Sequence, residues 1–257
     1  MANVNHNVRR YVQGSIQRKD FNMRNEEFET YINHVIETAK QILTKPVFVI
    51  TCGNCDMDPI SCKQKNCKEG SVIDEISIDT VCLYHLQKKE HDTLIDRCVD
   101  TSVKGYSFRL SGNLREDLGE AVFCDRETIQ AAFDEKTYTL DEETKSLISM
   151  FDDLEAYRKT PVDRTVFCVL RTNETEDDQT LYEVCVMKVI NVIITSRIGQ
   201  YDSYINDRAK MERDGYIVVF HLLDTAGGAT KVLGQQCFLD SEEAFAKAEE
   251  LNKGKRY

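Results

Sequence analysis

Four cysteines lie close together in a short, turn-rich stretch of the chain: Cys52, Cys55, Cys62 and Cys67. The first two have the C-x2-C spacing and enclose a Gly-Asn dipeptide, the kind of tight turn that a tetrahedral zinc site uses. The last two lack a second C-x2-C spacing. Three alternatives therefore stay open for this cluster: a zinc site, disulfides that form late, and unlinked thiols.

The histidines give no catalytic pattern. His6, His34, His85, His91 and His221 are scattered along the chain, without an H-x3-H pair and without a G-x-S-x-G elbow. His221 lies in an apolar run, which is typical of a hydrogen-bonded core histidine. Because no nucleophile, base and orienting group can be assembled from the sequence, we expect a protein that is not an enzyme.

The apolar periodicity predicts the elements that must position these residues. Helical spacing is predicted over residues 25–44, 126–133, 140–157 and 241–252, and β-branched or aromatic runs predict strands over 47–51, 76–86, 106–110, 165–171, 181–195 and 216–223. Cys124 and Cys168 have apolar neighbours and are predicted to be buried, inert thiols. The pattern indicates an α+β protein in which helices flank a mainly antiparallel sheet or sandwich.

Composition narrows the classes of function. The chain has 257 residues, 41% of them hydrophobic, and a net charge of −11. An acidic protein repels phosphate backbones, so direct nucleic-acid binding is not expected. No apolar run reaches the roughly 20 residues of a membrane helix, and the first residues lack the apolar segment of a secretory signal. We expect one domain over residues 25–257, in a reducing cytosol without membrane contact.

The first 24 residues have a separate character, that of a basic amphipathic arm. The arm contains Ala2, Asn3, Val4, Arg9, Arg10, Gly14, Gln17, Arg18, Phe21 and Asn22. The identity pattern at residues 1–4, 14, 17–18 and 21–22 resembles the N-terminus of cypovirus polyhedrins. A second segment, residues 213–218, resembles the turn into a C-terminal core strand of that family.

The resemblance implies a viral occlusion-body matrix protein. Members of this family crystallise in the host-cell cytoplasm around virus particles, and they form homotrimers with a β-sandwich core and a projecting N-terminal helical arm. In this interpretation residues 2–22 cross-link neighbouring trimers, and the partners are other copies of the chain and virions. The family is also associated with bound nucleotides, although no residue here matches a nucleotide site, and it gives no support for zinc at the cysteine cluster.

An occlusion protein must be stable at neutral pH and dissolve in an alkaline midgut. The chain holds 10 Cys and 11 Tyr besides its lysines, and these groups lose protons at about pH 8.5, 10 and 10.4. Their titration would add strong repulsion between packed copies and remove salt bridges donated by Lys. The leading alternative is a small zinc-binding regulatory or interaction protein, also viral, with Cys52, Cys55, Cys62 and Cys67 as ligands.

Overall fold

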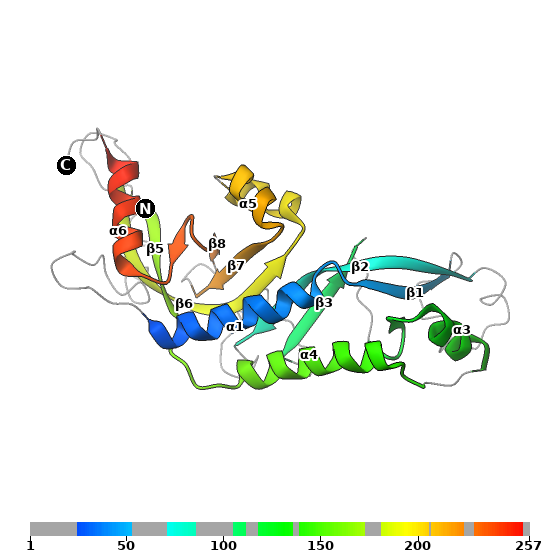
Figure 1. The fold of residues 1–257 in the computed structure, drawn as a ribbon. Helices are drawn as coiled ribbons and strands as arrows, with labels where there is room; N and C mark the ends of the chain where they lie inside the picture. The colour runs from blue at the N-terminus through cyan, green and yellow to red at the C-terminus, as the bar shows by residue number, and fades with distance from the viewer. Residues whose placement is uncertain are drawn as a thin grey trace, which may run out of the picture.

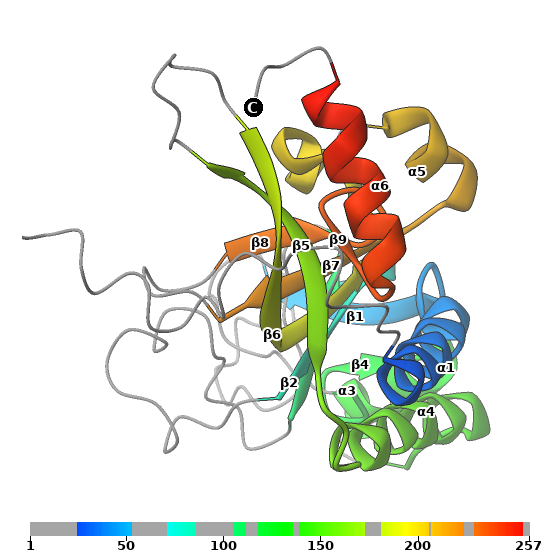
Figure 2. The same cartoon turned by 90° about the vertical axis from the view of Figure 1, so that its left-hand side faces the viewer.

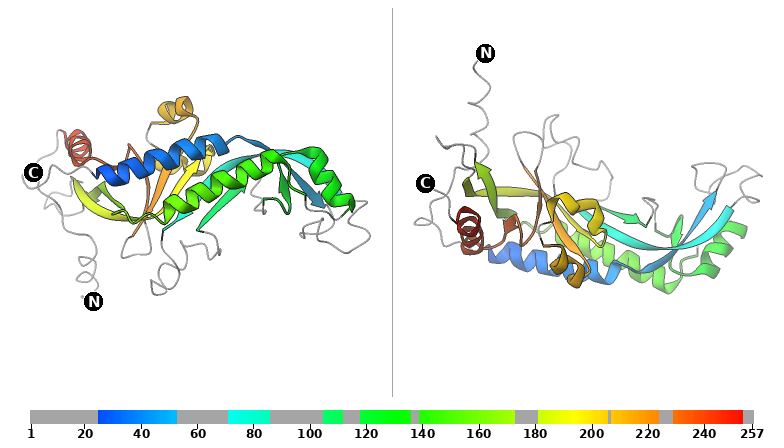
Figure 3. Two further views of the ribbon diagram at one scale, coloured as in Figure 1. Left: turned by 60° about the horizontal axis from the view of Figure 1, so that its bottom comes forward. Right: turned by 90° about the horizontal axis from the view of Figure 1, so that it is seen from above.

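The structure is a computed structural model that describes residues 25–52, 71–85, 105–111, 118–135, 139–172, 181–205, 207–223 and 229–253. The N-terminal arm predicted at residues 1–24 lies outside these ranges. The described chain is elongated, with the helices α1 (Glu26–Ile42) and α4 (Glu142–Arg158) lying lengthwise against one face of a long sheet (Figures 1 and 3).

In the described part of the chain, nine antiparallel strands form one connected sheet. They are β1 (Pro46–Cys52), β2 (Ser71–Tyr84), β3 (Tyr106–Leu110), β4 (Val122–Phe123), β5 (Thr165–Thr172), β6 (Leu181–Thr195), β7 (Ile217–Leu222), β8 (Ala229–Val232) and β9 (Cys237–Phe238). The strand order is β4-β1-β2-β6-β5-β9, while β3 pairs with β2, and β7 pairs with both β6 and β8. The predicted α+β class, with an antiparallel sheet core flanked by helices, is confirmed.

Two long strands each belong to two parts of the sheet. The first half of β2 pairs with β1 as far as Ser77, and its second half pairs with β3 and β6. Likewise β6 pairs with β5 up to Lys188 and then with β2 and β7. The register shifts at the two changeovers, next to Asp79 in β2 and Ile190 in β6. Since a bulge bends and twists its strand, these shifts let each long strand change partners.

The main core lies between the helix pair and the central strands. In α1 the apolar residues recur at helical spacing, and Asn25 caps the helix by accepting a hydrogen bond of 3.1 Å from the Phe28 amide. Asp141 caps α4 in the same way through the Thr144 amide. The buried side chains that meet here include Phe28, Ile32, Val35, Leu147, Phe151, Leu154, Val81, Leu83, Val192, Ile194 and Phe220. Burial of this apolar set is the largest stabilising contribution to the fold.

Three smaller clusters cover the rest of the sheet. Helix α3 (Arg126–Glu135) packs on β1 and β4 at one end, and α6 (Ser241–Asn252) packs on β5 and β6 at the other (Figure 1). On the central strands, the face opposite α1 and α4 is covered by the 3₁₀ segment η4 (Ile198–Tyr204) through Tyr201. The short helix α5 (Arg208–Asp214) follows η4 along the chain.

Candidate functional site

Most residues singled out from the sequence lie outside the described ranges. This applies to every residue of the arm (Ala2, Asn3, Val4, Arg9, Arg10, Gly14, Gln17, Arg18, Phe21 and Asn22) and to Cys55, Cys62 and Cys67. Cys52 is the last residue of β1, where its backbone pairs with Ser71 at the start of β2. The β1–β2 pairing therefore brings together the two ends of the connection whose sequence contains the other three cysteines.

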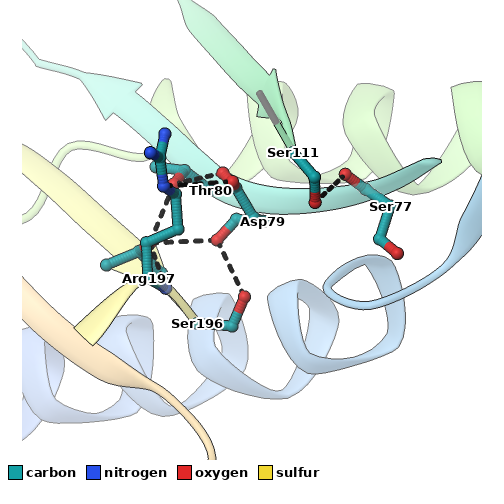
Figure 4. A network of polar contacts seen from close by, with 7 residues as sticks. Ser77, Asp79, Thr80, Ser111, Ser196 and Arg197 are labelled. Atoms are coloured by element: carbon teal, nitrogen blue, oxygen red, sulfur yellow. Dashed lines mark hydrogen bonds and ion pairs between the residues drawn. The ribbon is translucent and has the colours of Figure 1, made fainter. Parts of the chain in front are cut away.

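A buried polar network occupies the bulge of β2 (Figure 4). The Asp79 side chain is 7% exposed, and its Oδ2 lies 3.4 Å from Nε of Arg197, which follows β6. Its other carboxylate oxygen accepts a hydrogen bond of 2.8 Å from the Thr80 hydroxyl. The network thus places a paired carboxylate inside the sheet, at the point where the strand paired with β2 changes from β1 to β6.

The backbone at the bulge is also bound by side chains. The carbonyl oxygen of Asp79 accepts hydrogen bonds from the Ser196 amide at 2.9 Å, the Thr195 hydroxyl at 3.0 Å and the Ser196 hydroxyl at 3.2 Å. Nearby, the amide and hydroxyl of Ser111 both donate to the carbonyl of Ser77 (Figure 4). Because a bulge leaves a residue out of the ladder, these bonds replace the strand partners that it lacks.

A second polar cluster joins α1 to the end of β2. The phenol oxygen of Tyr31 lies 3.1 Å from Nε2 of His85, and the Arg164 guanidinium lies over the Tyr31 ring, 5.5 Å from its centre. Burial raises the pKa of Tyr31 far above its usual value, although the nearby Arg164 opposes that shift. Burial, reinforced by Arg164 and Arg158, holds the pKa of His85 well below its usual value.

Two arginines hold the end of α4 in this cluster. Arg158 forms a two-pronged ion pair with Glu155, with N–O distances of 2.6 and 2.7 Å, and it donates to the carbonyl of Tyr84 at 3.1 Å. These bonds lower the pKa of Glu155. Arg164 donates to the carbonyls of Arg158 and Thr160, both at 2.7 Å. Because the C-terminus of a helix carries partial negative charge, Arg164 stabilises the end of α4.

The Tyr31–His85 pair is unsuited to proton transfer near neutral pH. A general acid or base works best when its pKa lies near the working pH. The pKa of Tyr31 lies far above that range and the pKa of His85 well below it, so both side chains stay neutral. The pair joins the helix α1 to the end of β2.

Three thiols form a row across neighbouring strands. Cys168 of β5 lies opposite Cys185 of β6 on one side and opposite Cys237 of β9 on the other. All three are buried and unlinked. Burial raises the pKa of Cys185 to about 11 and of Cys168 to about 12, and it raises that of Cys237 well above its usual value. The prediction that Cys124 and Cys168 are buried is confirmed.

Sequence reasoning identified some of these positions and missed others. His221 is a hydrogen-bonding residue of β7, as predicted, with its Nδ1 3.3 Å from the amide nitrogen of Asn191. The Asp79–Arg197 pair was missed because its members are far apart in sequence. The alternation of β2 breaks at Asp79, which is the one local signal of a bulge there.

Neither a metal-binding cluster among the described residues nor a match to a known protein identifies a further site. Within the described ranges, no set of three or more His, Cys, Asp or Glu side chains is arranged to hold a metal ion. Of the helices described, none combines the length and the apolar character needed to cross a bilayer. No protein-family model matches the chain, and no curated protein sequence or solved structure matches it significantly.

Proposed function

We propose that this protein is a structural matrix protein of viral occlusion bodies, similar to the cypovirus polyhedrins. In this proposal copies of the chain form trimers that assemble into crystals in the host-cell cytoplasm, enclose virus particles and dissolve in alkali. The basic arm at residues 1–24 links neighbouring trimers. The support comes from the arm's resemblance to that family and from the composition of the buried core, and no catalytic role is part of the proposal.

The observation that carries the proposal is a core that contains several buried thiols and a buried phenol, which are groups that ionise in alkali. Its buried groups include the thiols of Cys124, Cys168, Cys185 and Cys237, and the phenol of Tyr31. Burial raises the pKa of every one of them, in the case of Cys124 to about 11. A group whose pKa is higher in the folded state stabilises the fold fully below its unfolded-state pKa, and that contribution is lost as the pH rises towards the folded-state value.

The expected loss of stability falls in the alkaline pH range in which an occlusion protein must dissolve. Consider a thiol with an unfolded-state pKa of 9.0 and a folded-state pKa of about 12, such as Cys168. Its ionisation lowers the free energy of unfolding by about 1.4 kcal/mol at pH 10. Several such thiols together withdraw a large share of the roughly 5–15 kcal/mol that typically stabilises a folded chain. The loss begins near pH 9, so neutral pH leaves the fold unaffected.

Expression of this chain alone in insect cells tests the proposal. We expect refractile intracellular crystals that persist at pH 7 and dissolve at about pH 10–11 in the presence of a reductant. The reductant matters because disulfides between cysteines could hold the crystals together in alkali. A soluble monomer in these cells, or crystals that persist at pH 11 with reductant, would show that the proposal is wrong.

A zinc-binding regulatory or interaction protein is the second candidate, and the β1–β2 hairpin favours it. Pairing of Cys52 with Ser71 brings the two ends of the connection at residues 53–70 together. Cys55, Cys62 and Cys67 belong to this connection in the sequence, and four cysteine thiolates are a usual ligand set of a structural zinc site. Bound zinc would then stabilise the β1–β2 pairing.

Metal analysis of the purified, dissolved protein separates the two candidates. The zinc-binding protein would contain one zinc per chain, and chelation or Cys55→Ser would release the metal and lower the melting temperature. The matrix protein would crystallise in cells whether or not zinc is bound. Cys124→Ser serves as a control, because this buried thiol lies beyond the hairpin connection.

A further inference from the structure

The geometry of the thiol row distinguishes its two neighbouring pairs. Val169 donates its amide hydrogen to the carbonyl of Gln236, so Cys168 and Cys237 form a non-hydrogen-bonded pair of the β5–β9 ladder. Such pairs have their Cα atoms about 4.5 Å apart, with the side chains closest together. The Val189 amide donates a hydrogen bond to the carbonyl of Arg164 across β5 and β6. Hydrogen-bonded and non-hydrogen-bonded pairs alternate along an antiparallel ladder, so Cys168 and Cys185 are a hydrogen-bonded pair, with Cα atoms about 5.5 Å apart.

Both separations suit a covalent bond between the sulfur atoms. Residues directly opposite each other in antiparallel strands project to the same face of the sheet. Disulfides span Cα distances of about 4.4–6.8 Å, so Cys168 is within reach of either neighbour. The closer approach in the non-hydrogen-bonded pair favours Cys237 over Cys185.

We propose that Cys168 and Cys237 are an intrachain disulfide-forming site, which closes on reaction with a small-molecule disulfide and in which Cys185 is the alternative partner of Cys168. The inference concerns two of the buried thiols that the occlusion-body proposal uses, but it rests on the strand pairing alone. It also differs from the cysteine cluster at residues 52–67, because Cys168, Cys185 and Cys237 belong to the strands β5, β6 and β9.

The strand that carries Cys237 explains how a buried thiol can react. β9 has two residues, lies at one end of the strand order and pairs with β5 at Phe238 and Cys237, next to the hydrogen bond from the Val169 amide to the Gln236 carbonyl. Local opening of so short a strand costs less than global unfolding. Opening exposes Cys237 and Cys168 together, since they face each other, while the rest of β5 stays paired with β6.

The reaction balances as two exchange steps. The Cys237 thiolate attacks one sulfur of the small disulfide and releases one small thiol. The Cys168 thiolate then attacks the Cys237 sulfur, forms the Sγ–Sγ bond and releases the second small thiol. The two protein thiols lose two protons and two electrons, which the small disulfide gains. The reaction is slow at neutral pH because both thiols are buried until β9 opens and only a small fraction of an exposed thiol is then ionised. It is faster in mild alkali because that ionised fraction grows.

The new bond would fasten one end of the molecule. Helix α6 begins at Ser241, shortly after β9, and packs on β5 and β6 (Figure 2). A Cys168–Cys237 bond would therefore fix β9, and α6 behind it, to β5. Because the bond closes a long stretch of chain, it restricts the unfolded state and stabilises the fold.

Tryptic mapping of the oxidised full-length protein tests the site. The purified protein is refolded or incubated with oxidised glutathione at about pH 8.5, free thiols are alkylated, and the digest is analysed by mass spectrometry. Cys168, Cys185 and Cys237 lie on separate tryptic peptides, residues 165–171, 172–188 and 232–247. We expect the linked 165–171/232–247 peptide to become the dominant form, with a higher melting temperature than the reduced protein.

Two variants sharpen the result. In Cys237→Ala we expect a 165–171/172–188 link to replace the lost one, whereas Cys124→Ala, a matched change at a buried thiol outside the row, keeps the original link. Circular dichroism confirms that each variant is folded. The proposal is overturned if the wild-type thiols stay free even after refolding in glutathione buffer. It is also overturned if they end as glutathione adducts, or if Cys168 links mainly to Cys185 in the wild type.

Discussion

The phenol oxygen of Tyr31 in α1 lies 3.1 Å from Nε2 of His85 at the end of β2. This hydrogen bond joins the helix layer to the sheet. The Tyr31 side chain is 2% exposed, and its ring stacks on that of Phe28 with centroids 5.7 Å apart. Because the bond is largely buried, removing the Tyr31 hydroxyl leaves Nε2 of His85 without this partner.

Tyr31→Phe is therefore expected to destabilise the protein by about 1–3 kcal/mol, the usual cost of a buried polar group left unpaired. The ring and its packing are retained, so the loss reports on the hydroxyl alone. Urea denaturation at pH 7 measures it. Tyr157→Phe is a matched control, since Tyr157 is 37% exposed and packs through its ring on His34. An equal effect in both variants would argue against a special role for the Tyr31–His85 bond.

Stability should fall between about pH 6.5 and pH 5, because buried histidine resists protonation. The depressed pKa of His85 means that the unfolded chain binds a proton first, so His85 stabilises the fold above its unfolded-state pKa and this contribution is lost as the pH falls. His221, whose pKa burial also lowers, acts in the same direction. Glu155 has a depressed pKa too, but it acts only below its usual value of 4.5.

His85→Gln separates the contribution of this residue. The amide can still pair with Tyr31 but does not titrate, so we expect a shallower fall in the unfolding free energy over this pH range. The decrease in slope should approach about 1.4 kcal/mol per pH unit below the unfolded-state pKa. Denaturation curves at several pH values give the slope directly. A slope identical to that of the wild type would contradict the burial argument.

The Asp79–Arg197 ion pair should show measurable coupling. Removing Arg197 leaves the buried Asp79 carboxylate with Thr80 as its side-chain donor, at an expected cost of about 1–3 kcal/mol. The value is below that of a fully buried pair because Arg197 is 33% exposed. A double-mutant cycle of Asp79→Ala and Arg197→Ala should give a coupling energy of about 1 kcal/mol or more.

The exposed pair Lys145–Glu142 in α4 provides the comparison, with side chains 51% and 91% exposed. Solvent screening should reduce its coupling to a few tenths of a kcal/mol. Similar coupling in the two cycles would mean that the bulge network adds nothing beyond a surface ion pair. The same urea denaturation assay serves both cycles.

The sequence predicts helices and strands correctly where a regular pattern of apolar residues continues over many positions. The predicted strand over residues 181–195 matches β6, and the predicted helix over residues 241–252 matches α6, since both have long apolar patterns and α6 also has its Asp240 cap. The first part of β2 was missed because Asp74 and Glu75 interrupt its apolar pattern. The two-residue strands β4 and β9 are too short for any period to register.

The sites are harder to predict because they depend on register. Cys168 is recognisable in the sequence as a core thiol, but its position between Cys185 and Cys237 follows only from two strand pairings. Likewise the contact of Asp79 with Arg197 requires the bulge that brings β2 onto β6. A shift of one residue in either ladder would send these side chains to the other face of the sheet.

Alkaline destabilisation should depend on individual buried thiols. In the presence of a reductant, we expect the unfolding free energy to fall steeply between pH 9 and pH 11, since the unfolded chain loses its thiol protons first. Cys168→Ala should reduce this fall by about 1.4 kcal/mol at pH 10, because the pKa of Cys168 is raised to about 12 in the fold. Chemical denaturation across this range measures both proteins, and an unchanged pH dependence in the variant would contradict the assignment.

Deletion of residues 2–22 tests whether the arm makes the lattice. The described sheet, its helix layer and the core between them consist of residues from 25 onwards. The shortened chain should therefore fold and stay soluble as a trimer. It should no longer crystallise in insect cells, because the basic arm is proposed to bind acidic neighbours. A full-length variant with Arg9, Arg10, Arg18 and Lys19 changed to Gln keeps the arm's length but not its charge, and it should crystallise poorly. Normal crystals from the shortened chain would show that assembly does not depend on the arm.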